Sequence, residues 1–132
     1  MAVQTEGVLL LQDSSRTVIR LEEVDAVRRS RNPRRVYIMM GNTSHVFTYE
    51  SVEKALEDFE KVVSSMGDSA LSLNDEEPTV VDKTAVIGVR DFDFKEELIV
   101  MFPSWTLISR FVSLADRLEA YDKLVEALSE QP

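Results

Sequence analysis

The sequence predicts an α+β fold: two tandem repeats of an antiparallel β-meander followed by one helix, packed as an intramolecular pseudo-dimer. The first observation behind this prediction is an internal repeat, because residues 7–66 align without a gap on residues 69–128. The second is a change of period within each repeat. Short apolar or β-branched runs come first, and apolar residues then recur at every third or fourth position, which predicts strands followed by a helix.

The aligned positions hold identical residues as well as pairs of similar apolar residues. Among the identical pairs are Asp13 and Asp75, Thr17 and Thr79, Val18 and Val80, Val27 and Val89, and Arg28 and Arg90. The matched apolar pattern supports the repeat more strongly than identity does, with Val36-Ile38-Met40 aligned on Leu98-Val100-Phe102.

The first repeat, residues 1–66, contains short segments with the composition of β-strands. β-Branched and aromatic residues are frequent in them, and the turn signals Asn32-Pro33 and residues 41–44 lie between them. The expected strands are residues 8–12, 17–21, 24–29, 36–40 and 45–49. Connections this short favour antiparallel neighbours.

A helix is expected over residues 51–66 at the end of the first repeat. Its apolar residues, from Val52 to Met66, recur at spacings of three and four and form one apolar stripe. Ser51 can cap the helix, because its hydroxyl can accept a hydrogen bond from a free N–H of the first turn. Gly67 can end it, because glycine readily adopts the backbone conformation that stops a helix.

The second repeat, residues 67–132, has the same plan. Its helix is expected over residues 113–129, with Ser113 in the place of Ser51. The linker of residues 67–69 is too short to let the two repeats move apart. We therefore expect one compact body rather than two independent domains.

The strand expected at residues 36–40 is apolar on both faces, because Tyr37 and Met39 alternate with three other apolar residues. The helix of its own repeat can cover only one of these faces. The second face needs cover from the other repeat or from a second chain. An apolar sheet face is therefore a candidate contact surface.

The composition indicates in which cellular compartment the protein is expected. The chain of 132 residues is 44% hydrophobic and has no cysteine, which fits a globular protein of a reducing compartment. It has no long uncharged apolar run, and its first residues lack the basic and then apolar pattern of a signal peptide. We expect a cytoplasmic location and no association with membranes.

No motif indicates catalysis, a cofactor or a bound metal. His45 is the only histidine, and no His/Asp/Glu cluster has ligand spacing. The sequence has no phosphate-binding loop, dinucleotide fingerprint or nucleophile elbow. Neighbouring carboxylates such as those of Asp75-Glu76-Glu77 are interpreted as a solvated turn. The expected protein is not an enzyme and has no catalytic residues.

The strongest candidate site is the arginine hairpin, residues 28–35, because guanidinium groups can bind carboxylates or phosphates in pairs of hydrogen bonds. Its arginines are Arg28, Arg29, Arg31, Arg34 and Arg35. The aligned segment is the acidic hairpin, whose candidate contact residues are Asp91, Phe92, Asp93, Phe94, Glu96 and Glu97. Opposite charge at aligned positions favours pairing of the hairpins, within one chain or between two. An outside anion, or no partner at all, is the alternative for the arginine hairpin.

Charge distribution bears on the partner. The formal net charge is −9, and most of it belongs to the second repeat. A negative surface argues against general nucleic-acid binding. The favoured function is a non-enzymatic interaction or assembly protein, which forms a homo-oligomer or binds a protein partner through the charged hairpins and the apolar sheet face.

Two alternatives remain open at this point. One is a module that sequesters an anionic small molecule, such as a nucleotide, through the arginine hairpin. The other is an acidic decoy that binds a basic partner through the second repeat.

Overall fold

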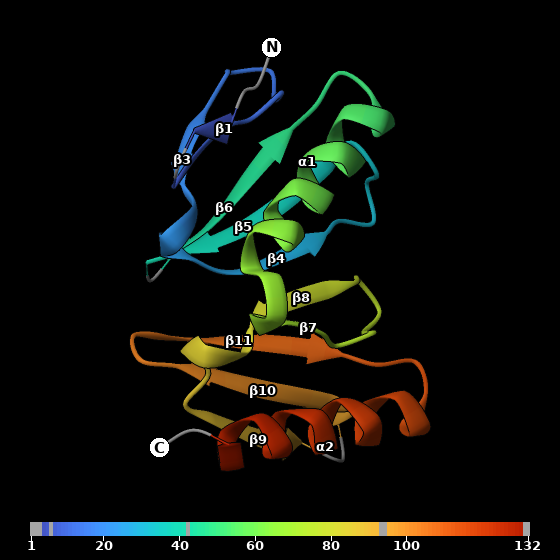
Figure 1. Ribbon diagram of the computed structural model, residues 1–132. Helices are drawn as coiled ribbons and strands as arrows, with labels where there is room; N and C mark the ends of the chain where they lie inside the picture. The colour runs from blue at the N-terminus through green and yellow to red at the C-terminus, as the bar shows by residue number, and fades with distance from the viewer. Residues whose placement is uncertain (1–3, 6, 42, 93–94, 131–132) are drawn as a thin grey trace.

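The computed structural model describes residues 4–5, 7–41, 43–92 and 95–130, and its fold is α+β (Figure 1). The elements of the first half are β1 (Gln4–Thr5), β2 (Val8–Leu10), β3 (Val18–Arg20), β4 (Val24–Arg29), β5 (Arg35–Met40), β6 (Thr43–Thr48) and α1 (Val52–Met66). Those of the second half are β7 (Ala70–Ser72), β8 (Thr79–Asp82), β9 (Gly88–Phe92), β10 (Glu97–Phe102), β11 (Trp105–Arg110) and α2 (Leu114–Glu130). Short 3₁₀ turns at Leu21–Glu23, Gly67–Ser69 and Lys83–Ala85 complete the list.

The strands of the described residues form three antiparallel sheets, and one of them contains strands from both halves. The outer sheets have the orders β1-β2-β3 and β11-β10-β9. The central sheet has the order β6-β5-β4-β8-β7, so the first hairpin of the second half extends the sheet of the first half. In Figure 1 the sheet β1-β2-β3 lies at one end of the molecule, and β9-β10-β11 lies at the other end beside α2.

Both helices begin where the sequence predicts. The Ser51 hydroxyl accepts a hydrogen bond from the N–H of Lys54 at 3.2 Å, and the Ser113 hydroxyl accepts one from the N–H of Asp116 at 3.3 Å. Helix α1 ends at Gly67, whose φ of +57° is unfavourable for residues with a side chain. No helix in the described part of the chain is long and apolar enough to cross a membrane.

Two hydrophobic clusters form the core, one under each helix. The first joins α1 to the inner face of β4 and β5, and the second joins α2 to β10 and β11. Met39 of β5 is buried in the second cluster, and Tyr37 packs against that cluster. The second half therefore covers the other face of β5. Of the two covers expected for this face, the other half of the chain supplies it, and the prediction that the face serves a partner molecule is wrong.

The buried carboxylate of Asp58 connects the hairpin of β2 and β3 to α1. The Asp58 side chain is 1% exposed and accepts hydrogen bonds from the Tyr49 hydroxyl (2.9 Å), the Gln12 N–H (2.7 Å) and the Gln12 amide (3.1 Å). Burial and the neighbouring negative charge of Asp58 raise the pKa of Tyr49, so this hydroxyl keeps its proton. At the aligned positions the second half has Ala120 and Phe111, which cannot form such a network.

Removing this carboxylate should destabilise the protein strongly. Asp58→Ala leaves the Gln12 N–H and the Tyr49 hydroxyl buried without an acceptor, and we expect the free energy of unfolding to fall by roughly 3 kcal/mol. Tyr49→Phe removes one donor and leaves the other bonds in place, and it should cost only about 1 kcal/mol. Urea unfolding measures both values. Equal losses of unfolding free energy in the two variants would contradict the inference that Asp58 holds the whole network together.

A hydrogen bond between Trp105 and Asp25 joins the two halves near the start of β4. The Trp105 indole N–H donates to the Asp25 carboxylate at 3.0 Å, and its ring stacks on Phe102 with 4.5 Å between centroids. Burial raises the pKa of Asp25, the hydrogen bond from Trp105 opposes that shift, and the charges of Asp82 and Glu23 add to it. Ionised Asp25 therefore costs stability.

Asp25→Asn should raise the free energy of unfolding near pH 7, because asparagine keeps an acceptor for Trp105 and removes the penalised charge. The pKa of Asp25 is higher in the folded than in the unfolded chain, so the wild type regains stability as the pH falls through the folded value. The advantage of the variant should disappear below about pH 4, where both states of the wild type are protonated. Urea unfolding at several pH values tests this, and an advantage independent of pH would refute it.

Candidate functional site

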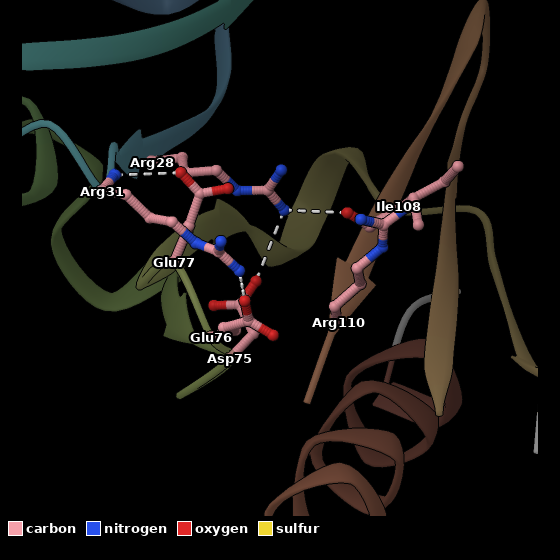
Figure 2. A pocket seen from close by; sticks show the side chains of 7 residues that line it. All are labelled: Arg28, Arg31, Asp75, Glu76, Glu77, Ile108 and Arg110. Atoms are coloured by element: carbon pink, nitrogen blue, oxygen red, sulfur yellow. Dashed lines mark hydrogen bonds and ion pairs between the residues drawn. The ribbon is translucent and has the colours of Figure 1, made fainter. Parts of the chain in front are cut away.

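The arginine hairpin lies against the turn between β7 and β8 and against β11, and these segments enclose a shallow pocket of about 370 Å³ (Figure 2). The pocket is lined by Arg28, Arg31, Asp75, Glu76, Glu77, Ile108 and Arg110. Cations and carboxylates face each other across it, so each must be assigned to its partner before any of them can be considered a ligand site.

Arg28 joins the two halves of the chain. Its Nε donates to the Thr79 hydroxyl at 2.7 Å, and its Nη2 donates to the Ile108 carbonyl at 3.0 Å. The same nitrogen is 3.4 Å from the Asp75 carboxylate, whose side chain is only 1% exposed (Figure 2). Asp75 also accepts from the Thr79 N–H and hydroxyl, each at 2.8 Å, and from the Ser109 hydroxyl at 2.6 Å. The expectation of a solvated turn is wrong for Asp75, and Arg28 has a structural role.

Arg31 contacts the two residues that follow Asp75 in the turn between β7 and β8. Its guanidinium forms an ion pair with Glu76, and its backbone N–H donates to the Glu77 carboxylate at 3.0 Å. Two of the five arginines are therefore engaged by acidic residues of the second half. These acidic residues belong to the β7–β8 turn and not to the acidic hairpin.

The acidic hairpin pairs within its own half. Asp91 lies 3.1 Å from Nε of Arg117, which is buried in α2, and Glu97 accepts a hydrogen bond from Arg110 at 2.9 Å. The predicted pairing between the two charged hairpins is therefore wrong. Each hairpin finds its countercharge on a segment that the internal alignment does not place opposite it.

The remaining described residues of the acidic hairpin are Phe92 and Glu96. Phe92 is half-buried, with the Arg90 guanidinium 5.2 Å and the Lys95 ammonium 5.7 Å from its ring centroid. Glu96 is exposed and has a φ of +56°. Asp93 and Phe94 lie outside the described residues.

Three arginines of the hairpin have no carboxylate partner in the described part of the chain, namely Arg29, Arg34 and Arg35. Arg34 and Arg35 are exposed, and Arg29 is half-buried. Arg34 and Arg35 meet β6, where Arg35 is paired with Thr48 and the Arg34 carbonyl accepts from the Tyr49 N–H at 2.8 Å. Arg29 ends β4 and is paired with Val36 of β5.

A fourth arginine reaches this region from a distant segment. The turn of residues 13–16 is held on β6 by a hydrogen bond from the Ser14 N–H to the Thr48 carbonyl, at 2.9 Å. Exposed Arg16 closes this turn. We define Arg16, Arg29, Arg34 and Arg35 as the basic corner. Arg16 was not predicted as a site residue, and only the contact of its turn with Thr48 brings it near the others.

Within the described residues, no group of three or more His, Cys, Asp or Glu side chains could hold a metal ion. Exposed His45 stacks on Phe47, with 6.3 Å between ring centroids. The chemistry that the basic corner can perform is the recognition of anionic oxygens by guanidinium groups.

Comparisons with known proteins place the fold. No family model and no curated protein matches this chain. Among solved structures, the chain is similar to one described as the LytTr DNA-binding domain of a methyl-accepting/DNA response regulator from Bacillus cereus. The TM-score is 0.55 and the sequence identity 10%, over 92% of this chain and 98% of that one. The two chains thus share a fold over nearly their whole lengths.

This likeness corrects our functional expectations. We expected nucleic-acid binding to be unfavourable, yet the fold is one that occurs in a DNA-binding domain. A negative net charge by itself does not exclude nucleic-acid binding, because binding depends on the local charge of the contact surface. The assignment to interaction or assembly proteins acting through charged hairpins and an apolar face is also wrong. So are its alternatives, a module that sequesters an anionic small molecule and an acidic decoy.

Substitution should separate the structural arginine from its exposed neighbour. Arg28→Met leaves the buried Asp75 carboxylate without its cation, and we expect the free energy of unfolding to fall by roughly 3 kcal/mol. Arg31→Met removes an exposed ion pair and should change it by less than about 1 kcal/mol. Urea unfolding of both variants provides the measurement. A loss at Arg31 as large as that at Arg28 would contradict this distinction.

Proposed function

We propose that this chain is a non-enzymatic domain that binds double-stranded DNA. The observation that carries the proposal is the likeness to a LytTr DNA-binding domain, which extends over 92% of this chain and 98% of the other. A role on DNA also favours the cytoplasmic location that the absence of cysteine suggests.

The basic corner is the surface that we assign to the DNA backbone. Arg16, Arg34 and Arg35 are exposed, and all three belong to segments that meet at Thr48 on the end of β6. Guanidinium groups can each give two hydrogen bonds to one phosphate. A cluster drawn from two turns can follow successive phosphates of a strand, which sets the position and orientation of the protein on the duplex.

The neighbouring acidic turn does not prevent this role. Asp75 is paired with Arg28 and Glu76 with Arg31, and Glu77 accepts a hydrogen bond from a backbone N–H. These contacts reduce the negative potential beside the basic corner. They also hold the arginine hairpin in place, so that Arg34 and Arg35 are presented on an ordered turn.

The number of arginines limits the salt dependence. Each phosphate contact with duplex DNA contributes a slope of about −0.9 to log K against log salt. Four arginines therefore predict a slope no steeper than roughly −4. The rest of the acidic surface is expected to repel DNA, so binding should be confined to the orientation in which the basic corner faces the duplex.

Charge reversal at the corner tests the proposal. The double variant Arg34→Glu, Arg35→Glu should bind at least tenfold more weakly than the wild type, because two phosphate contacts become repulsive. Fluorescence anisotropy with a random-sequence duplex library at low salt gives the affinity, and the slope with salt counts the contacts. A matched control is Arg20→Glu, Lys123→Glu, which changes the net charge equally at two exposed positions away from the corner.

The outcomes are distinct. Weaker binding in the corner variant and nearly unchanged binding in the control support the proposal. Equal loss in both variants would mean that DNA senses only net charge and would refute the assignment to the basic corner. No binding by the wild type at low salt would refute DNA binding itself.

A further inference from the structure

The edge of β4 is occupied by β8, whereas no described strand lies on the aligned edge of β9. Strand β4 pairs with β5 on one side and with β8 on the other. Strand β9 is the last strand of its sheet among the described residues, with β10 as its neighbour. Strand β3, which aligns with β8, is also last in its sheet and has β2 as its neighbour. The molecule thus has one filled strand-pairing site and both parts of a second one, unfilled.

The turn before β3 has the same residue types as the turn that stabilises the pairing of β8 with β4. Asp13 aligns with Asp75 and Thr17 with Thr79. The Asp13 carboxylate accepts from the Thr17 N–H at 2.8 Å and from the Thr17 hydroxyl at 2.7 Å. Asp75 makes the same two bonds with Thr79, each at 2.8 Å. The turn before β3 is therefore already shaped like the turn that Arg28 binds.

The hairpins are also held on their own halves in the same way. The Ser14 N–H donates to the Thr48 carbonyl at 2.9 Å, and the aligned Glu76 N–H donates to the aligned Arg110 carbonyl at 2.7 Å. The β2–β3 hairpin is thus held on the first half by the backbone bond that holds β7–β8 on the second. The β7–β8 hairpin in addition projects its outer edge onto β4. The β2–β3 hairpin projects the equivalent edge into solvent.

Side chains of β3 and β9 are more exposed than the aligned side chains of β8 and β4. Val80 of β8 is 7% exposed because the first half covers it, whereas the aligned Val18 of β3 is 59% exposed. Val27 of β4 is fully buried, whereas the aligned Val89 of β9 is half-buried. Arg90, aligned with Arg28, is exposed and makes no ion pair in the described part of the chain.

We propose that β9 of one molecule pairs antiparallel with β3 of a second molecule, in the register that joins β4 to β8. That register places Val89 opposite Val18, Gly88 opposite Ile19 and Arg90 opposite Thr17, by analogy with the pairs Val27–Val80, Ala26–Val81 and Arg28–Thr79. Arg90 of one molecule then binds Asp13 of the next. Val125 and Leu128 of α2, which align with Val63 and Met66 around the first core, cover Val18.

The geometry makes this contact head-to-tail. Strands β3 and β9 lie at opposite ends of the molecule, so one molecule cannot satisfy both edges by itself (Figure 1). A contact of this kind leaves a free edge at each end of the pair and can add further molecules. It uses backbone edges and the Asp13–Thr17 turn, and it involves neither the pairing of the charged hairpins nor the sheet face that the core buries. It rests on other observations than the DNA-binding proposal, although the turn of residues 13–16 contributes Arg16 to the basic corner and Asp13 to this contact.

Two variants break the contact from opposite sides. Val18→Glu places a charge in the β3 edge and leaves β9 intact, and Arg90→Glu opposes Asp13 and leaves β3 intact. Both side chains are exposed, so both variants should fold normally. Sedimentation velocity from about 1 μM to about 1 mM covers the Kd range of a small interface. We expect the wild type to associate with rising concentration and each variant to bind itself at least tenfold more weakly.

Mixing the variants tests the direction of the contact. Val18→Glu retains a working β9 edge and Arg90→Glu a working β3 edge, so an equimolar mixture should form a one-to-one dimer that does not grow. Val112→Glu is the matched control, because Val112 is 84% exposed and lies on neither edge. It should associate like the wild type.

Three results would overturn the proposal. The first is a wild type that stays monomeric throughout the concentration range. The second is association that Val18→Glu and Arg90→Glu leave unchanged. The third is a mixture of the two variants that contains no dimer. None of these results bears on DNA binding, which is measured separately with the basic-corner variants.

Discussion

The pairing of β8 with β4, locked by Arg28 on the Asp75 carboxylate, is the contact on which the rest of the structure depends. It merges strands of both halves into one sheet and places the second half where it can bury Met39. Asp75 is stable in its buried position because four donor groups surround its two oxygens. The same contact removes Arg28 from the set of arginines that can bind a ligand.

The two halves stabilise equivalent structure with different chemistry. In the first half the carboxylate of Asp58 binds the preceding hairpin to α1, whereas the second half has Ala120 at that position. In the second half Arg117 is buried in α2 and pairs with Asp91, whereas the first half has Ala55 there. A buried charge is tolerated only with its own partners, and the half that lacks Asp58 or Arg117 has a small apolar residue in its place.

A formal charge of −9 does not prevent a locally basic surface, because the local field depends on the charges that lie nearby. The formal charge of −9 includes carboxylates that face Arg28, Arg31, Arg110 and Arg117. Arg34 and Arg35 have no carboxylate partner among the described residues, and they lie where the turn that carries Arg16 meets the end of β6. The local field at a phosphate depends on these few groups within a Debye length rather than on the net charge.

The sequence by itself determined the α+β class, both helices with their serine caps, and most strand positions. These features depend on local periodicity and on residues such as Ser51 and Gly67, whose effects extend over a few neighbours. Only the tertiary structure decided which charges meet. Opposite charge at aligned positions suggested that the arginine and acidic hairpins would pair, but Asp91 pairs with Arg117 and the arginine hairpin pairs with the β7–β8 turn. Long-range pairing depends on how the strands are ordered in the sheets. In this chain the deciding step was the addition of β8 to β4 across the boundary between the halves, which no local pattern encodes.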